Sequence, residues 1–340
     1  MTNMQYPVPK QKYKVKVQCC TYNQSQYIED ALKGFAIQQT NFPFVCCIFD
    51  DASTDGEQEV LKRWIENHCN SEDVVTYDHP LTIILMAPDK DNPNCIYAVH
   101  LQKVNTWGKP DKQEIMSHWE SQCEYIALCE GDDYWIDPLK LQKQVDFLDT
   151  NPEYGMVYTY YRTLFENKKQ IRCKPKDNTT YVEMLYESPV ATLTTLIRSE
   201  YMSSYHEVIT KFDNSSWQMG DYPQWLWVAY KSKLYCLKDE TAVYRVLASS
   251  ASHKTTFQST ESFLLSCLDV SSQFAKLLPM EGAEEALIRG KNKVYTRIFH
   301  HAIYFREQKY VDKYYKKINK NFKVVLKYYI FKLSTILKFR

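Results

Sequence analysis

Three short polar clusters hold the side chains of this sequence that are best suited to chemistry. They are Thr21-Tyr22-Asn23, Asp50-Asp51-Ala52-Ser53-Thr54-Asp55-Gly56 and Glu130-Gly131-Asp132-Asp133-Tyr134-Trp135. Each cluster directly follows an apolar run of strand length. In a parallel sheet the carboxyl ends of the strands share one edge, and ligands bind there. A single acidic turn is usually a helix cap, but three clusters at successive strand ends predict a common site.

The third cluster places the carboxylates of Glu130, Asp132 and Asp133 within four residues. Such dense negative charge is unfavourable unless a cation neutralises it. Oxygen ligands select a hard divalent ion, Mg²⁺ or Mn²⁺, which also binds phosphates. We expect Asp51, Glu130 and Asp132 to meet around one such cation.

Residue spacing excludes several other kinds of site. The eight glycines do not form a dinucleotide-binding GxGxxG, a P-loop or a GxSxG nucleophile elbow. The segment from Asp51 to Gly56 imitates the start of an EF-hand, but the twelfth position is Lys62 instead of the required glutamate. A bound nucleotide is therefore expected to be held by side chains and acidic groups.

The elements that must position these clusters alternate between strand and helix in the first half of the chain. Strands are predicted at 15–20, 44–49, 82–86 and 124–129, and helices at 26–38 and 57–67. Residues 88–114 have a weaker pattern, which we interpret as a helix with a loop inserted near 107–110. This alternation predicts a parallel sheet between helices. Residues 154–246 mix strands and short helices, and residues 257–340 have helical patterns throughout.

The three clusters carry a family resemblance together with Gly220-Asp221-Tyr222-Pro223-Gln224-Trp225-Leu226-Trp227. Over residues 13–250 the chain resembles the GT-A-fold nucleotide-sugar glycosyltransferases of family 2, the inverting enzymes of bacterial polysaccharide assembly. The resemblance implies an α/β fold whose Rossmann-related, mostly parallel sheet is flanked by helices. It implies a glycosyltransferase domain at 1–250, with a donor half at 13–150 and an acceptor half at 151–250. A helical, basic C-terminal extension at 251–340 completes the expected organisation.

The resemblance also implies roles for individual residues. Asp51 matches the acid that contacts the nucleobase. Glu130-Gly131-Asp132 matches the DxD signature, with Glu where Asp is more usual. The match implies that Glu130 lies near the ribose and that Asp132 binds the metal with support from Asp133. Asp221 matches the general base that removes the proton from the acceptor hydroxyl. The alternative for Asp221 is an ordinary N-cap of the helix that follows it.

Further candidates for the donor site follow the first predicted strand. Thr21, Tyr22 and Asn23 occupy this position. The ring of Tyr22 is suited to stacking on a base, although an aromatic residue at a strand end more commonly serves packing.

Two arginines and one histidine are the remaining candidates. Arg198 and Arg245 have the guanidinium fork that suits phosphate oxygens, and surface ion pairs are the alternative. The segment from Tyr244 to His253 resembles the closing segment of the family. His253 is therefore a candidate metal ligand, whereas a lone histidine is more often structural.

The resemblance predicts a metal-dependent, inverting transfer of a sugar from a nucleoside-diphosphate donor, with UDP as the expected nucleotide. The expected acceptor is a carbohydrate or lipid-linked glycan in capsule or O-antigen assembly. One alternative is a sugar-phosphate nucleotidyltransferase, although the glycine- and basic-rich loop usual after its first strand is missing. The other alternative is a non-catalytic glycan-binding protein with the same fold.

The net charge of +1 conceals a strongly basic C-terminal region. Residues 286–340 hold 15 of the 42 Lys and Arg residues but only two of the 41 Asp and Glu residues. From residue 316 onwards, lysines alternate with apolar and aromatic residues, which predicts an interfacial helix attracted to an anionic membrane. A homodimer formed by such helices is the alternative. Nucleic acid is not expected, because no recognised nucleic-acid-binding motif accompanies the charge.

Cysteine usage and apolar segments bear on location. The eleven cysteines lack zinc-type spacing, residues 1–17 contain no apolar signal segment, and no run of 18 apolar residues predicts a spanning helix. We therefore expect a cytoplasmic protein, associated peripherally with the inner face of the cell membrane.

Overall fold

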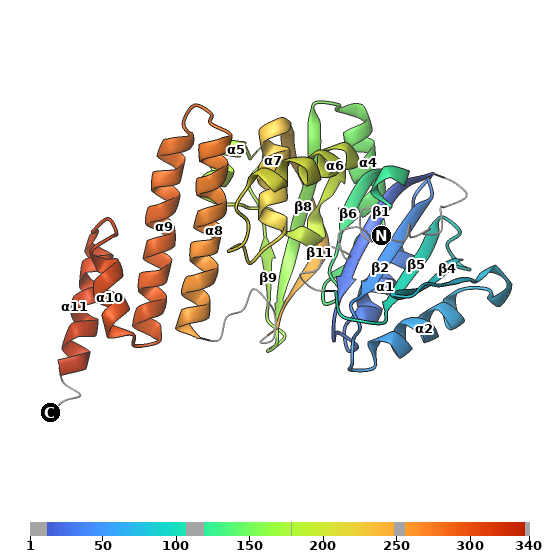
Figure 1. Cartoon of the computed structure of the whole chain (residues 1–340), viewed down its shortest axis with the longest axis horizontal. Helices are drawn as coiled ribbons and strands as arrows, with labels where there is room; N and C mark the ends of the chain where they lie inside the picture. Colours follow the sequence, from blue (N-terminus) through green and yellow to red (C-terminus); the bar gives the residue numbers. More distant parts are fainter. Residues whose placement is uncertain (1–11, 107–118, 178, 248–255, 337–340) are drawn as a thin grey trace. The chain divides into compact units, whose positions relative to one another are not determined.

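The structure is a computed structural model that describes residues 12–106, 119–177, 179–247 and 256–336 (Figure 1). The chain divides into two compact units. The first, which we call the sheet unit, comprises Met1–Thr179, Pro189–Val208 and Trp227–Val246. The second, which we call the helical unit, comprises Thr180–Ser188, Ile209–Leu226 and Leu247–Arg340.

One eleven-stranded sheet organises the described residues of the sheet unit. Its neighbouring parallel strands are, in order, β5 (Cys95–Gln102), β2 (Phe44–Asp50), β1 (Tyr13–Thr21) and β6 (Cys123–Leu128). On the β5 side, the sheet continues antiparallel through β4 (Thr82–Pro88) and β3 (Val75–Asp78). Beyond β6 follow β10 (Leu196–Arg198), β8 (Tyr154–Phe165), β11 (Lys233–Val246) and β7 (Tyr134–Trp135), and β9 (Gln170–Cys173) pairs with β8.

Both faces of the parallel strands are buried. All seven residues of β2 are buried, as expected of a continuous apolar strand in a parallel sheet. Cys46 belongs to a core that includes residues of α1 (Ile28–Ala36), α2 (Glu57–His68) and α4 (Lys140–Thr150). Its neighbour Cys47 belongs to a second core with Trp119. The adjacent cysteines therefore fill opposite faces, because side chains alternate along a strand.

The helical unit has a core of its own. Its longer helices are α8 (Phe257–Leu277), α9 (Ala283–Tyr304), α10 (Gln308–Tyr315) and α11 (Phe322–Ile336), and α5 (Tyr181–Tyr186) packs on α9. Helices α5 and α9 approach closely at Gly290, where an added Cβ would lie 3.0 Å from the Leu185 carbonyl oxygen. The capping box of Thr256 and Ser259 begins α8. Among the helices in the described part of the chain, none combines the length and apolarity needed to cross a bilayer.

Two further helices belong to the middle of the chain. α6 (Ser199–Val208) lies in the sheet unit, and α7 (Asp221–Lys231) begins in a segment of the helical unit and ends in one of the sheet unit. The predicted fold class is confirmed: a mostly parallel central sheet is flanked by helices, and the C-terminal region is helical.

The helix predicted within 88–114 is wrong. Residues 95–102 form β5, whose eight residues are all buried between β2 and β4. This run is short, apolar and buried on both faces, so it lacks the polar face that a surface helix would show. A tight turn precedes β5, in which Asp89 Oδ1 accepts from the N–H groups of Asp91 (2.9 Å) and Asn92 (3.0 Å). Residues 107–114 of this region lie outside the described residues.

Candidate active site

Hydrogen bonds fasten the loop after β1 to the loop after β2. Asn23 has a left-handed backbone (φ 54°), its N–H donates to Ser53 Oγ (2.9 Å), and its Oδ1 accepts from the Thr54 N–H (2.8 Å). The Ser25 N–H donates to Asp55 Oδ2 (2.9 Å). Asn is one of the few residue types that adopt this backbone readily. Asn23 therefore joins the two loops.

A buried carboxylate, that of Glu57, lies beneath these loops. It accepts from the Thr21 hydroxyl, the Gln24 N–H (2.9 Å) and the Ser53 hydroxyl (2.9 Å). Burial raises the pKa of the Glu57 carboxyl, and the three donors act in the opposite direction. The sequence analysis missed Glu57, because an acid in the first turn of a helix is usually a surface residue. Its contacts place Thr21 within the framework of the site.

The third cluster forms a group of carboxylates at the end of β6. One oxygen each of Glu130, Asp132 and Asp133 lies within 4.8 Å of the others. The Gly131 N–H donates to the Cys20 carbonyl oxygen (3.1 Å), so this group lies beside the end of β1. We call these three residues the carboxylate cluster. Neighbouring strands β1 and β6 therefore bring the first and third sequence clusters together.

Burial gives the carboxylate cluster unusual electrostatics. It raises the pKa of Asp132, against the effect of hydrogen bonds and Arg245. Burial and the nearby Asp132 charge push the pKa of Asp133 well above its usual range. Glu130 is exposed. All the ligand atoms that the carboxylate cluster offers are oxygens, and negative charge on several of them at once is unfavourable without a cation. The cluster therefore fits a hard divalent cation such as Mn²⁺ or Mg²⁺.

Arg245, near the end of β11, binds the loop that carries the carboxylate cluster. Its backbone N–H donates to Asp133 Oδ1 (2.8 Å), and its Nη1 donates to the Asp132 carbonyl oxygen (2.8 Å). Its guanidinium also pairs with Asp30 and lies over the Tyr134 ring, 4.4 Å from the centroid. The structure therefore brings Arg245 to the carboxylate cluster, where several of its donors already bind protein groups.

Position 131 requires glycine, because neighbouring side chains approach its backbone too closely to leave room for a Cβ. A Cβ there would lie 2.6 Å from Gln24 Oε1 and still closer to Thr21 Oγ1. We expect Gly131→Ala to lower the free energy of unfolding by about 1–3 kcal/mol, because the loop must move to relieve the overlap. Urea unfolding measures this loss. Gly220→Ala is the matched control, since a Cβ there meets nothing within 4 Å; equal stability of both variants would contradict the close approach.

Asp51 is positioned by the segment after β5. Its Oδ1 accepts from the Thr106 N–H (2.6 Å) and hydroxyl (2.7 Å), and its carbonyl oxygen accepts from Asn105 Nδ2 (3.0 Å). The expectation that Asp51 joins Glu130 and Asp132 around one cation is corrected, because the cluster consists of Glu130, Asp132 and Asp133. The strand order gives the reason: Asp51 follows β2 and is held from the β5 side, whereas the carboxylate cluster follows β6, on the far side of β1.

Arg198 lies far from the carboxylate cluster. It pairs with Tyr125, near the start of β6, whereas the cluster follows the end of that strand. Its guanidinium donates to the carbonyl oxygens of Leu148 (2.6 Å) and Tyr154 (2.9 Å). The structure therefore does not bring Arg198 to the predicted phosphate site. The arginine instead connects the end of α4 to the sheet.

The other predicted residues are placed as follows. Tyr22 is 49% exposed at the end of β1, so its ring is accessible. Asp221 is the first residue of α7, half-buried, and its Oδ1 accepts from the Tyr222 N–H (2.8 Å). It therefore occupies the helix start that its N-cap alternative predicted. His253 lies outside the described residues.

Lys140, the first residue of α4, is a buried cation that the sequence analysis missed. Its Nζ lies 4.1 Å from the centroid of the Trp135 ring and donates to Gln144 Oε1 (2.7 Å). Burial lowers its pKa to about 7, against the effect of Cys129 and Asp137. A lysine at a helix start is ordinarily a surface residue, so no pattern in the sequence indicated this environment.

The lowered pKa of Lys140 predicts a pH-dependent stability. Between about pH 7 and 10.5 the unfolded chain keeps this proton and the folded chain loses it, so stability rises with pH by up to about 1.4 kcal/mol per unit. Lys140→Met is expected to lack this rise, as measured by urea unfolding across this range. Lys33→Met, at an exposed position of α1, serves as the control and should keep it. Identical pH profiles for Lys140→Met and the wild type would contradict the prediction.

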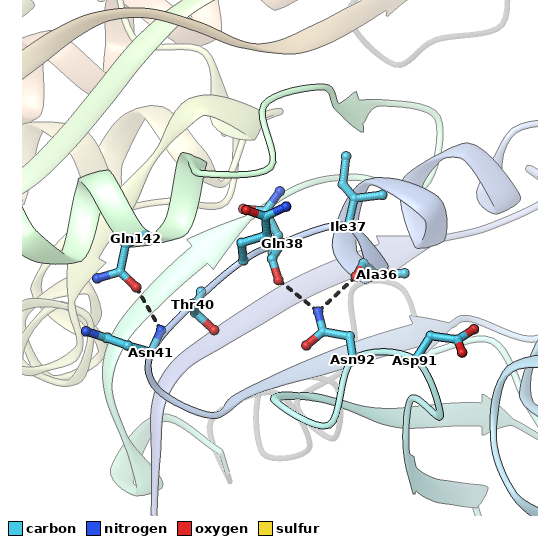
Figure 2. Close-up of a pocket in the computed structure, with 9 residues that line it drawn as sticks. Ala36, Ile37, Gln38, Thr40, Asn41, Asp91, Asn92 and Gln142 are labelled. Carbon is cyan, nitrogen blue, oxygen red and sulfur yellow. Dashed lines mark hydrogen bonds between the residues drawn. The ribbon is translucent and has the colours of Figure 1, made fainter.

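A surface hollow of about 740 Å³ lies away from these residues (Figure 2). It is lined by Ala36, Ile37, Gln38, Gln39, Thr40, Asn41, Asp91, Asn92 and Gln142. Figure 2 shows Asn92 Nδ2 donating to the carbonyl oxygens of Gln38 (2.8 Å) and Ala36 (2.9 Å). Most of the lining precedes β2, whereas Asp51 follows it, and a seven-residue strand spans about 23 Å. The hollow is therefore not part of the candidate active site.

Comparison with known proteins gives the fold its context. No protein-family model matches the chain. The uncharacterized protein Rv1520 of Mycobacterium tuberculosis is 33% identical over 147 residues, which are 43% of this chain and 35% of that protein. The uncharacterized protein Mb1547 of Mycobacterium bovis matches to the same extent. The chain thus spans about a third of the length of the curated relatives it matches.

Two solved structures share the fold. TarS 1–349 of S. aureus in complex with UDP is 16% identical, with a TM-score of 0.51 over 83% of this chain and 72% of that one. The mannosyltransferase PcManGT of Pyrobaculum calidifontis, in complex with GDP-Man and Mn²⁺, is 15% identical, with a TM-score of 0.50 over 87% and 77%. At these identities the similarity establishes the fold alone.

Proposed function

We propose that this chain is a metal-dependent nucleotide-sugar glycosyltransferase. The observation that carries the proposal is the carboxylate cluster, whose oxygens lie within 4.8 Å of one another at the carboxyl end of β6. In an open α/β sheet this edge is where ligands bind. The fold shared with a mannosyltransferase bound to GDP-Man and Mn²⁺ supports the same proposed function.

Asp132 and Asp133 would hold the metal, and the exposed Glu130 would contact the ribose of the donor, as the DxD match implies. A divalent ion bound there supplies positive charge that neutralises the carboxylates and the diphosphate of the departing nucleotide. Arg245 keeps the loop in place through Asp132 and Asp133, and this preorganisation lowers the cost of binding. His253 is a further ligand by resemblance to the family.

The loops after β1 and β2 would hold the nucleotide. The exposed ring of Tyr22 is available to stack on the base, and Asp51, with one oxygen fixed by Thr106, would accept a hydrogen bond from it. The family resemblance makes UDP the proposed nucleotide, and the N3–H of uracil is a group that this carboxylate could accept from. Asn23 and Thr21 act indirectly, because they bind protein groups that fix the two loops.

Asp221 is the proposed general base of an inverting transfer. Its carboxylate would take the proton of the acceptor hydroxyl as that oxygen attacks the anomeric carbon and the bond to the nucleoside diphosphate breaks. A positioned base of this kind contributes about 10²–10⁴ in rate. The proposed acceptor is a carbohydrate or lipid-linked glycan of a cell-surface polysaccharide, and this assignment, like the membership of family 2, rests on the motif resemblance.

A donor screen tests the proposal. The chain is incubated with a panel of nucleoside-diphosphate sugars, with Mn²⁺, with Mg²⁺ or with a chelator, and thermal unfolding and nucleoside-diphosphate release are followed. A true donor at 100 times its Kd should add about 2.7 kcal/mol of stability, and release should need the metal. Pyrophosphate formed from a sugar phosphate and a nucleoside triphosphate would instead identify a nucleotidyltransferase. Glycan binding without release from any donor would identify a non-catalytic protein.

A further inference from the structure

The last helix in the described chain is α11 (Figure 1). Some of its apolar side chains are buried and others are exposed. One face is packed: Val324 and Phe331 are buried in the core of the helical unit together with Val311 and Tyr314 of α10. This contact accounts for only part of the apolar side chains in the helix. Tyr328 also packs against that core, whereas five other apolar side chains of the helix are exposed.

The second face is an exposed apolar stripe. With 3.6 residues per turn, its five side chains fall within an arc of roughly 100°. These residues, which we call the α11 stripe, are Phe322, Leu326, Tyr329, Ile330 and Leu333, and they are between 46% and 79% exposed. Scattered exposed apolar residues are normal, but a contiguous stripe of this width marks an interaction surface.

Lysines border the α11 stripe on both sides. On the same helical wheel, Lys323 and Lys327 follow the stripe on one side and both are exposed. Lys332 lies on the other side, where it pairs with Asp312 (2.9 Å). The helix itself contains no Asp or Glu. The turn before it adds further exposed lysines at 316, 317 and 320.

We propose that the α11 stripe and its lysine border dock on an anionic membrane surface, with the helix lying in the plane of the interface. An apolar stripe flanked by lysines is complementary to lipid chains beneath negatively charged headgroups. A second copy of the chain is less complementary, because a two-fold contact through the same face would bring Lys323 and Lys327 of both copies together, and α11 contains no acid to pair them. The inference goes beyond the proposed glycosyl transfer and does not depend on it.

Vesicle flotation of the full chain tests this surface. We expect binding to vesicles of equal parts phosphatidylcholine and phosphatidylglycerol, and little binding to phosphatidylcholine alone. The variant Leu326→Gln/Ile330→Gln should bind the mixed vesicles at least about tenfold more weakly, because it removes apolar insertion. Lys323→Gln/Lys327→Gln should weaken binding about thirtyfold at low salt.

Matched controls separate this surface from general stickiness and from catalysis. Val75→Gln/Ile171→Gln removes two exposed aliphatic side chains of the sheet unit and should float like the wild type. The lysine variant keeps the stripe, so it tests the proposal even if the glutamine variant misfolds. Nucleoside-diphosphate release in solution should be unchanged in all three variants, which distinguishes failure of this proposal from failure of the proposed transfer.

Three results would overturn the membrane proposal. The first is equal flotation of the wild type and both α11 variants. The second is equal binding to neutral and anionic vesicles. The third is absence of vesicle binding together with a light-scattering mass that falls from two copies to one in the glutamine variant, which would assign the α11 stripe to an interface between copies of the chain.

Discussion

Asp132→Asn is expected to reduce metal-dependent nucleoside-diphosphate release by at least about 10²–10³-fold. The substitution keeps the shape of the side chain but removes one charge from the carboxylate cluster, and the metal contributes several kcal/mol to stabilising charge in such transfers. The variant should need a higher Mn²⁺ concentration for half-maximal release, and it should release product more slowly at saturating Mn²⁺. The measurement is a Mn²⁺ titration of product release with the best donor from the screen.

The control is Asp146→Asn, which removes an acid from an exposed position of α4 outside the cluster. It should retain the wild-type Mn²⁺ titration. Because Asp132 is buried, unfolding in urea must also be compared to show that the variant is folded. A folded Asp132→Asn protein with the wild-type metal titration would remove the metal site from the proposed function.

Asp221→Asn is expected to lose transfer by about 10²–10⁴-fold while it still binds the donor nucleotide. The amide cannot take a proton from the acceptor hydroxyl, but it still accepts the N–H at the start of α7, where Asp221 Oδ1 now binds Tyr222. The substitution therefore separates a chemical role from a capping role. The measurements are acceptor-dependent product formation and nucleotide-induced thermal stabilisation.

Asp213→Asn is the matched control for this second prediction. Asp213 is an exposed acid of the same unit that accepts from Ser215, and its replacement should leave transfer unchanged. If Asp221→Asn transferred sugar at the wild-type rate, the assignment of the base would be wrong. If Asp221→Ala lost stability and Asp221→Asn lost nothing, the residue would be a helix cap.

The strands that position the site were predictable because their signal is local. The runs at 44–49 and 124–129 are continuous and apolar, and they became β2 and β6 with nearly the expected bounds. β5 was missed for a related reason: a short apolar run gives no period that separates a buried strand from a buried helix. Its assignment depends on distant segments, since β2 and β4 hydrogen-bond to its two edges and two hydrophobic cores bury its faces.

Single side chains also differ in whether a local sequence signal indicates their role. Glu130, Asp132 and Asp133 are adjacent in sequence, and one loop brings their oxygens together. Glu57 and Lys140 showed no such signal, because their burial comes from segments distant along the chain. The same is true of Arg198, whose guanidinium binds carbonyl oxygens contributed by Leu148 and Tyr154.

The amino-acid sequence alone determined the α/β class, the acidic loop after β6 and the basic, apolar character of the last helix. These properties follow from hydrophobic periodicity and from charges close together in the chain. Tertiary structure decided which strands are neighbours. The order β5-β2-β1-β6 separates Asp51 from the carboxylate cluster and joins Gly131 to the end of β1. Strand order depends on packing between segments far apart in sequence, and no local pattern encodes that packing.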